Sequence, residues 1–121
     1  MISKKTMVLG ASTNPSRYSF MATHRLKENK HQVIPVGIKK GSIAELPIIN
    51  GKPLYQDIDT LTLYIGEARQ KEYYDYILEL NPKRVIFNPG TYNLELMDLL
   101  RKNSIEVVEA CTLVMLSVGN Y

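Results

Sequence analysis

Residues 5–25 read KTMVLGASTNPSRYSFMATHR, and this stretch decides the fold. A short apolar run, Met7–Leu9, meets the small residues 10–12, and apolar side chains then recur at helical spacing from Tyr18 onwards. The pattern is typical of a strand, a tight turn and a helix. Small residues let an anion approach the backbone N–H groups and the positive end of the helix dipole. We therefore expect an anion-binding site at this turn.

The composition indicates one domain, spanning residues 1–121. The chain has 121 residues, of which 45% are hydrophobic, and this is enough to form one ordinary core. It contains no long apolar stretch and no secretory signal, so we expect a cytoplasmic protein without a membrane partner. The single cysteine, Cys111, and the two histidines are too few for an internal disulfide or a structural zinc site, and we predict no metal.

The charge is unevenly distributed along the chain. Residues 1–40 hold eight basic residues and one acidic residue, whereas residues 41–121 hold seven basic and eleven acidic residues. The positive charge therefore lies with the proposed anion turn, and we expect Arg17, Lys39 and Lys40 to face a ligand. A nucleic-acid surface would interleave aromatic and basic residues, but the tyrosine cluster lies in the acidic part of the chain, so we predict no nucleic-acid partner.

Further apolar segments follow the first helix in alternation with helical patterns. Strands are expected at 31–36, 61–65, 84–87 and 105–108, and helices at 67–80 and from a cap at Thr91 to about Asn103. Residues 37–60 are irregular, with a small hairpin expected to turn at Asn50-Gly51. The apolar tail at 111–118 is compatible with a short helix or a last strand.

Strands that alternate with helices predict an α/β fold with a mainly parallel sheet covered on both faces. The expected architecture is a Rossmann-like three-layer αβα domain with five strands in the order 3-2-1-4-5. Ligands of such sheets bind at the carboxyl ends of the strands. This rule gathers residues 10–12, 36–37, 65–66 and 88–90 around one crevice.

The crevice is not typical of a dinucleotide site that binds NAD. Only the first glycine of G-x-G-x-x-G is present, and no acidic residue follows the second strand to bind ribose hydroxyls. Lys39 and Lys40 stand there instead. A nucleotide with a phosphate on its ribose is favoured, which leaves NADP and coenzyme A.

Three segments resemble the stand-alone CoA-binding domain family, which is similar to the CoA-binding domain of succinyl-CoA synthetase alpha subunits. They are GASTNPSRYS at 10–19, VIPV at 33–36 and VVEAC at 107–111, together with Gly90 after the fourth strand. The resemblance covers nearly the whole chain. This chain has Gly37-Ile38 where the family usually has Asn-Pro, and Asn88-Pro89-Gly90 where it often has Gln-x-Gly.

The resemblance implies a ligand, coenzyme A or an acyl-CoA, and a set of cofactor-binding residues. It implies that residues 10–13 cradle the pyrophosphate and that Arg17 pairs with a phosphate. It also implies that Val36 and Lys39 border the adenosine, that Ile65 and Gly66 line the opposite wall and that 88–90 face the pantetheine arm. The complete predicted set is Gly10, Ala11, Ser12, Thr13, Asn14, Arg17, Val36, Lys39, Lys40, Ile65, Gly66, Asn88 and Gly90.

No residue pattern indicates catalysis, so we predict a binding module and not an enzyme. His24 and His31 are expected in a helix and at the far end of a strand, Asp57 and Asp59 in a turn, and Cys111 as a packed thiol. Two alternatives stay open: an NADP-binding reductase-like protein, and a regulatory or interaction subunit that has lost ligand binding. We expect a monomer or homodimer, and a protein partner is compatible with either.

Overall fold

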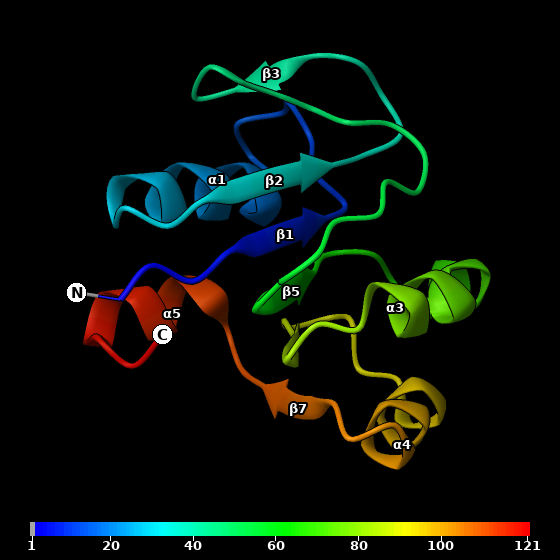
Figure 1. Cartoon of the computed structure of the whole chain (residues 1–121). Coiled ribbons are helices and arrows are strands. Elements are labelled where there is room, and N and C mark those ends of the chain that lie inside the picture. The colour runs from blue at the N-terminus through cyan, green and yellow to red at the C-terminus, as the bar shows by residue number, and fades with distance from the viewer. Residues whose placement is uncertain (1) are drawn as a thin grey trace.

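Five parallel strands form the central sheet of the computed structural model, which describes residues 2–121 (Figure 1). Their order across the sheet is β2-β1-β5-β6-β7, and every adjacent pair is parallel. The predicted Rossmann-like fold with a five-stranded parallel sheet is therefore confirmed. The strands are β1 (Thr6–Leu9), β2 (Val33–Val36), β5 (Thr60–Leu63), β6 (Arg84–Phe87) and β7 (Glu106–Glu109).

The predicted strand order 3-2-1-4-5 is wrong in the position of its third strand. That strand, β5, was expected beyond β2 but pairs with β1, where Leu61 lies opposite Met7. The main strands are thus arranged 2-1-3-4-5 in chain order, the other common order for sheets of this type. Strand β1 consequently lies between β2 and β5.

Pro35 explains why no main strand pairs with the outer edge of β2. Its carbonyl oxygen accepts a hydrogen bond from the Ile49 N–H (2.9 Å) on that edge. The N–H and C=O of one strand residue point to the same side, so the donor that proline lacks is missing from the outer edge. The segment after β2 covers this edge through one parallel bridge, between Val36 and Ile49.

The hairpin in this covering segment lies earlier than predicted. Strands β3 (Ser42–Ile43) and β4 (Leu46–Pro47) pair in antiparallel fashion, and the expected turn at Asn50-Gly51 forms no hairpin. The two turn residues, Ala44 and Glu45, have φ angles of 50° and 69°. Both central residues of a type I′ turn need positive φ, and non-glycine residues supply it here.

Helices cover both faces of the sheet (Figure 1). The helices α1 (Tyr18–Glu28) and α5 (Thr112–Val118) pack on one face, against Val8 and Val33. The opposite face carries the larger core, where Met7, Leu9 and Leu61 meet buried side chains from the remaining helices. These are α2 (Glu67–Gln70), the 3₁₀ helix η1 (Lys71–Tyr73), α3 (Tyr74–Leu80) and α4 (Leu94–Lys102).

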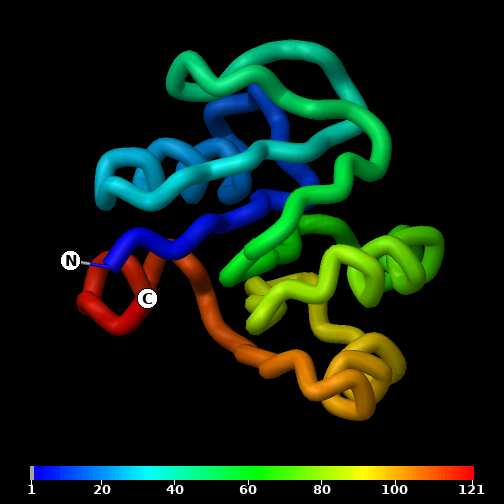
Figure 2. The backbone as a smooth tube through the Cα atoms, viewed as in Figure 1, coloured from blue at the N-terminus to red at the C-terminus, as the bar shows by residue number. Residues whose placement is uncertain are grey.

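Helix boundaries follow local sequence with three differences. The predicted helix 67–80 is a run of three short helices, and it ends at Asn81, whose φ of 51° is left-handed. Asn93 and not Thr91 caps α4, since the Asn93 side chain accepts from the Leu96 N–H (3.3 Å). The tail that the sequence left undecided is the helix α5. Figure 2 shows that this tail brings the described end of the chain beside its beginning.

Candidate ligand-binding site

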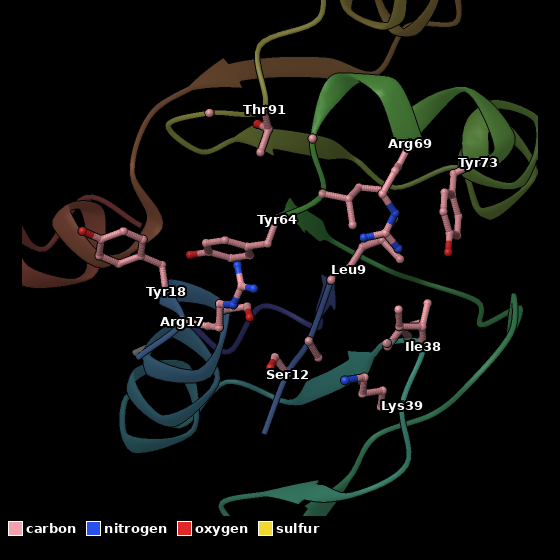
Figure 3. A pocket seen from close by; sticks show the side chains of 18 of the residues that line it. Leu9, Ser12, Arg17, Tyr18, Ile38, Lys39, Tyr64, Arg69, Tyr73 and Thr91 are labelled. Carbon is pink, nitrogen blue, oxygen red and sulfur yellow. The ribbon is translucent and has the colours of Figure 1, made fainter. Parts of the chain in front are cut away.

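A cleft of about 420 Å³ opens at the carboxyl ends of the central strands (Figure 3). Its walls come from the loops after β1, β2, β5 and β6 and from the first turns of α1 and α2. The lining residues are Leu9, Gly10, Ala11, Ser12, Thr13, Arg17, Tyr18, Ser19, Val36, Gly37, Ile38, Lys39, Tyr64, Ile65, Gly66, Arg69, Tyr73, Pro89, Gly90 and Thr91.

The cleft brings together ten of the thirteen residues that were predicted to bind a cofactor. Those that line it are Gly10, Ala11, Ser12, Thr13, Arg17, Val36, Lys39, Ile65, Gly66 and Gly90. Asn14, Lys40 and Asn88 do not line it. Asn14 and Lys40 are exposed, whereas Asn88 is buried beneath the floor.

Gly10 is required by the backbone at the turn after β1. Its φ is 102°, and a Cβ atom there would lie 2.9 Å from the backbone carbonyl carbon of Tyr64. A side chain would therefore push the loops after β1 and β5 apart. The predicted role of this glycine, an unobstructed turn, has this steric basis.

Two backbone donors of the turn are already used inside the protein. The N–H groups of Gly10 and Ala11 both donate to the Val36 carbonyl oxygen, each at 2.9 Å. This leaves the N–H groups of Ser12 and Thr13, which have no hydrogen-bond partner within residues 2–121. If an anion binds the turn through N–H groups, these two are the available donors.

The amino terminus of α1 is also open toward the cleft. Arg17 holds the cap position without a side-chain cap, and the N–H groups of Tyr18 and Ser19 have no partner in the described part of the chain. The Asn14 side chain instead accepts from the Ser16 N–H (3.0 Å) and shapes the loop. The helix dipole therefore faces the cleft with free donors at its positive end.

Three cationic side chains enter the cleft from three different elements (Figure 3). Arg17 precedes α1, Lys39 follows β2, and Arg69 lies on α2. No aspartate or glutamate lines the cleft, and none of the three cations forms an ion pair within residues 2–121. The site is electrostatically complementary to a ligand with several negative charges.

The sequence prediction missed ten lining residues. Some of them had a usable signal, because Gly37 and Tyr64 adjoin predicted site residues at strand ends. Arg69 and Tyr73 had none, since they lie within a predicted helix that gave no indication of which face meets the cleft. The full set missed is Leu9, Tyr18, Ser19, Gly37, Ile38, Tyr64, Arg69, Tyr73, Pro89 and Thr91.

A buried amide holds two cleft loops together. The Gln70 side chain is fully buried, and its Nε2 donates to the Ile65 carbonyl (2.9 Å) and to the Thr91 carbonyl (2.8 Å). Its Oε1 accepts from Asn93 Nδ2 (2.9 Å). The loops after β5 and β6 are thereby fixed relative to one another, which positions one wall of the cleft.

Asn88 performs a similar task beneath the cleft floor. Its Nδ2 donates to Thr62 Oγ1 (2.8 Å) and to the Leu63 carbonyl (2.9 Å), and its Oδ1 accepts from the Thr112 N–H (2.9 Å). These bonds join β5, β6 and the start of α5. The Asn88 amide is thus fully engaged within the protein.

Tyr64 forms part of the cleft wall close to the Arg17 side chain (Figure 3). Burial raises the pKa of Tyr64 to about 12, although the neighbouring Thr112 and Thr62 hydroxyls oppose the rise. The two threonine hydroxyls hydrogen-bond one another at 2.8 Å. Tyr64 is therefore neutral at physiological pH and adds no negative charge beside the cations.

Histidine, cysteine and carboxylate side chains lie outside the cleft lining. His24 packs against Phe20 within α1, and His31 Nδ1 accepts from the Lys4 N–H at the opposite end of the sheet. Asp59 lies near Arg84 (4.0 Å), and half-buried Cys111 precedes α5. Within residues 2–121 no cluster of His, Cys, Asp and Glu side chains is arranged to hold a metal ion.

The fold and the cleft define a class: a Rossmann-like αβα domain with a cationic site at the carboxyl ends of its parallel strands. The family described as CoA binding domain matches residues 4–117. The chain belongs to the CoA binding domain family, and the resemblance of the sequence motifs to that family is confirmed.

Solved structures share this fold over most of the chain. A crystal structure described as an uncharacterized protein is 51% identical, with a TM-score of 0.97 and full coverage of both chains. A hypothetical protein from Pyrococcus horikoshii OT3 is 23% identical, with a TM-score of 0.83, over 93% of this chain and 80% of that one. The protein cell-free ID.343 from Thermus thermophilus is 23% identical, with a TM-score of 0.86, over 98% and 91% of the two chains.

A search of the curated proteins finds no match. None of the helices formed by residues 2–121 combines the length and the apolar character needed to cross a lipid bilayer.

Proposed function

We propose that this protein binds coenzyme A or an acyl-CoA in the cleft and acts as a binding module without catalysis of its own. The observation that carries the proposal is the convergence of Arg17, Lys39 and Arg69 on a cleft whose lining lacks carboxylates. Coenzyme A has a pyrophosphate and a ribose phosphate, which together bear about four negative charges at neutral pH. Membership of the CoA binding domain family supports the same ligand.

The open donors suggest how the ligand lies. The pyrophosphate accepts from the N–H groups of Ser12 and Thr13 and faces the positive end of α1, and Arg17 pairs with the same charge. Lys39, at the end of β2, is placed for the ribose phosphate. This arrangement keeps the proposed roles of Ser12, Thr13, Arg17 and Lys39. It gives Gly10 and Ala11 a steric role, because their N–H groups are held by Val36.

The proposal that the protein is not an enzyme is supported by the chemistry of the lining. General acid–base catalysis near neutral pH commonly uses a histidine or a carboxyl group. Neither lines the cleft among the described residues, and burial keeps Tyr64 protonated. An NADP-dependent reductase is the second candidate, because Lys39 suits a ribose 2′-phosphate as well as a 3′-phosphate.

Isothermal titration of the purified protein with coenzyme A, NADP and NAD tests these candidates. We expect micromolar or tighter binding of coenzyme A, weakened about tenfold or more by Arg17→Ala, because that change removes a charge-assisted contact with phosphate. Arg25→Ala is the matched control, since Arg25 lies in the last turn of α1, away from the cleft.

Each other outcome selects a different function. Binding of NADP in preference to coenzyme A would support the reductase-like alternative. Absence of binding to all three ligands would overturn the proposal and support a subunit that has kept the fold for protein contacts.

A further inference from the structure

One end of the cleft has an apolar side chain on one lip and an arginine on the other (Figure 3). Ile38 and Lys39 lie on the loop after β2, whereas Arg69 and Tyr73 lie on α2 and η1 across the cleft. The two lips come from opposite sides of β1, because β5 and not β2 leads into α2. A ligand group at this end of the cleft therefore lies between two unlike walls.

Ile38 is unusually placed for an apolar residue. Its side chain is 68% exposed although it lies at the rim of a site with three cations. Single exposed apolar residues are common on protein surfaces and need no explanation. Beside Lys39, however, Ile38 offers an apolar surface next to a phosphate-binding charge, and a nucleotide base attached to a phosphorylated ribose presents these two features in the same order.

Arg69 enters the cleft without a partner. Glu67 and Glu72 lie on the same helical run, but no ion pair or side-chain hydrogen bond holds the Arg69 guanidinium within residues 2–121. Figure 3 shows this side chain extending from α2 into the cleft. A guanidinium is planar and weakly hydrated, so it stacks on the face of an aromatic ring as well as pairing with phosphate.

Tyr73 makes the Arg69 side of the slot a supported wall. Its ring lies 6.4 Å, centroid to centroid, from the buried Tyr76, and the ammonium group of Lys52 lies 5.2 Å from its centroid. Contacts of this kind hold the Tyr73 ring in place beside Arg69 (Figure 3). The wall is thus prepared before a ligand binds.

We propose that this end of the cleft is an adenine slot, in which the Arg69 guanidinium stacks on one face of the base and Ile38 covers the other. The inference rests on the proposed function, because it assigns the adenine of coenzyme A to this slot. It adds a base-recognition role to two residues that the sequence motifs did not indicate. It also gives Ile38, which departs from the usual Asn-Pro of the family, a specific contact.

Titration of coenzyme A and of adenosine 3′,5′-bisphosphate into Arg69→Ala, Arg69→Lys and Ile38→Ala tests the slot. Lysine keeps the charge of Arg69 but has no planar surface. We therefore expect Arg69→Lys to weaken binding of both ligands about tenfold, nearly as much as Arg69→Ala. Arg101→Ala is the matched control, since Arg101 lies on α4 beside Asp98 and outside the cleft. Thermal unfolding of each variant confirms that it is folded.

A double-mutant cycle with Ile38→Ala and Arg69→Ala checks that the two side chains bind the same group. Residues that sandwich one ring give a combined loss that differs from the product of the single losses. Arg69→Lys with unchanged affinity, or independent losses at the two positions, would overturn the slot while leaving the proposed function intact. If the unmodified protein binds neither ligand, the slot and the proposed function are both overturned.

Discussion

A Cβ atom on Gly37 would lie 2.3 Å from the carbonyl oxygen of Ala11, so the loops after β1 and β2 meet backbone against backbone. The Val36 carbonyl, one residue earlier, accepts from the N–H groups of both Gly10 and Ala11. These contacts lock the anion turn to the end of β2. The position of Lys39 relative to the turn depends on them.

Gly37→Ala should therefore disturb both stability and ligand binding. The added methyl group meets backbone, which cannot move as a side chain can, so we expect the free energy of unfolding to fall by about 2 kcal/mol. Urea denaturation measures the fall, and titration with coenzyme A measures the accompanying loss of affinity. Gly66→Ala is the stability control, because a Cβ there meets nothing within 4 Å. Equal stability of the two variants would contradict the close approach.

Asn88→Ala should destabilise the fold more than it weakens binding. Its amide makes three hydrogen bonds to β5 and the start of α5, and the buried partners would lose them. We expect a loss of about 3 kcal/mol in unfolding free energy. Coenzyme A affinity of the folded variant should stay within a few-fold, since Asn88 does not line the cleft. A stable variant with lost affinity would instead support the contact with pantetheine that the family resemblance implied.

Affinity for coenzyme A should fall as salt concentration rises. The Debye length shortens from about 10 Å at 0.1 M to about 3 Å at 1 M, which screens three cations that no lining carboxylate offsets. Titrations across this range should show a decline of about tenfold. Dephospho-coenzyme A carries fewer charges and should show a shallower decline. Salt-independent binding would mean that the cations do not contact the phosphates.

The histidine at the far end of the sheet should make stability depend on pH. The pKa of His31 is lowered, first by burial and then by the charges of Lys4 and Arg84, against an opposing effect of Asp59. Because the unfolded chain binds this proton more readily, the contribution of His31 is present above pH 6.5 and is lost as pH falls below that value. Thermal unfolding between pH 8 and pH 5 should show the loss.

His31→Asn is the matched variant for that experiment. Asparagine keeps an acceptor for the Lys4 N–H, which His31 Nδ1 now receives at 2.9 Å, and it does not titrate. The variant should lose stability less steeply than the unmodified protein as pH falls. The same slope in both proteins would assign the pH dependence to other groups.

Local patterns accounted for most of the elements. The buried strands were recognised because parallel strands covered on both faces are apolar throughout, and the first turn was recognised by its small residues. The hairpin was misplaced because Ala44 and Glu45 adopt positive φ angles that glycine or asparagine would have indicated. Thr91 was taken as a helix cap, but its hydroxyl donates to the Asn88 carbonyl within the loop.

The candidate site divides in the same way. Residues on the turn after β1 and at the ends of β2 and β5 were found from their places in the chain, since every parallel strand ends at the same edge. Asn88 follows β6 in the same manner, but its side chain points into a buried hydrogen-bond network. No local pattern distinguishes a strand-end residue that faces a ligand from one that supports the floor.

By itself, the sequence determined the strand–turn–helix unit, the parallel sheet and a cationic amino-terminal third, because these depend on spacing and composition within short stretches. Only the tertiary structure decided that β5 lies beside β1. That pairing depends on hydrogen bonds between distant segments and on the donor that Pro35 withholds from the outer edge of β2. It is also what places Arg69 and Tyr73 across the cleft from Ile38 and Lys39.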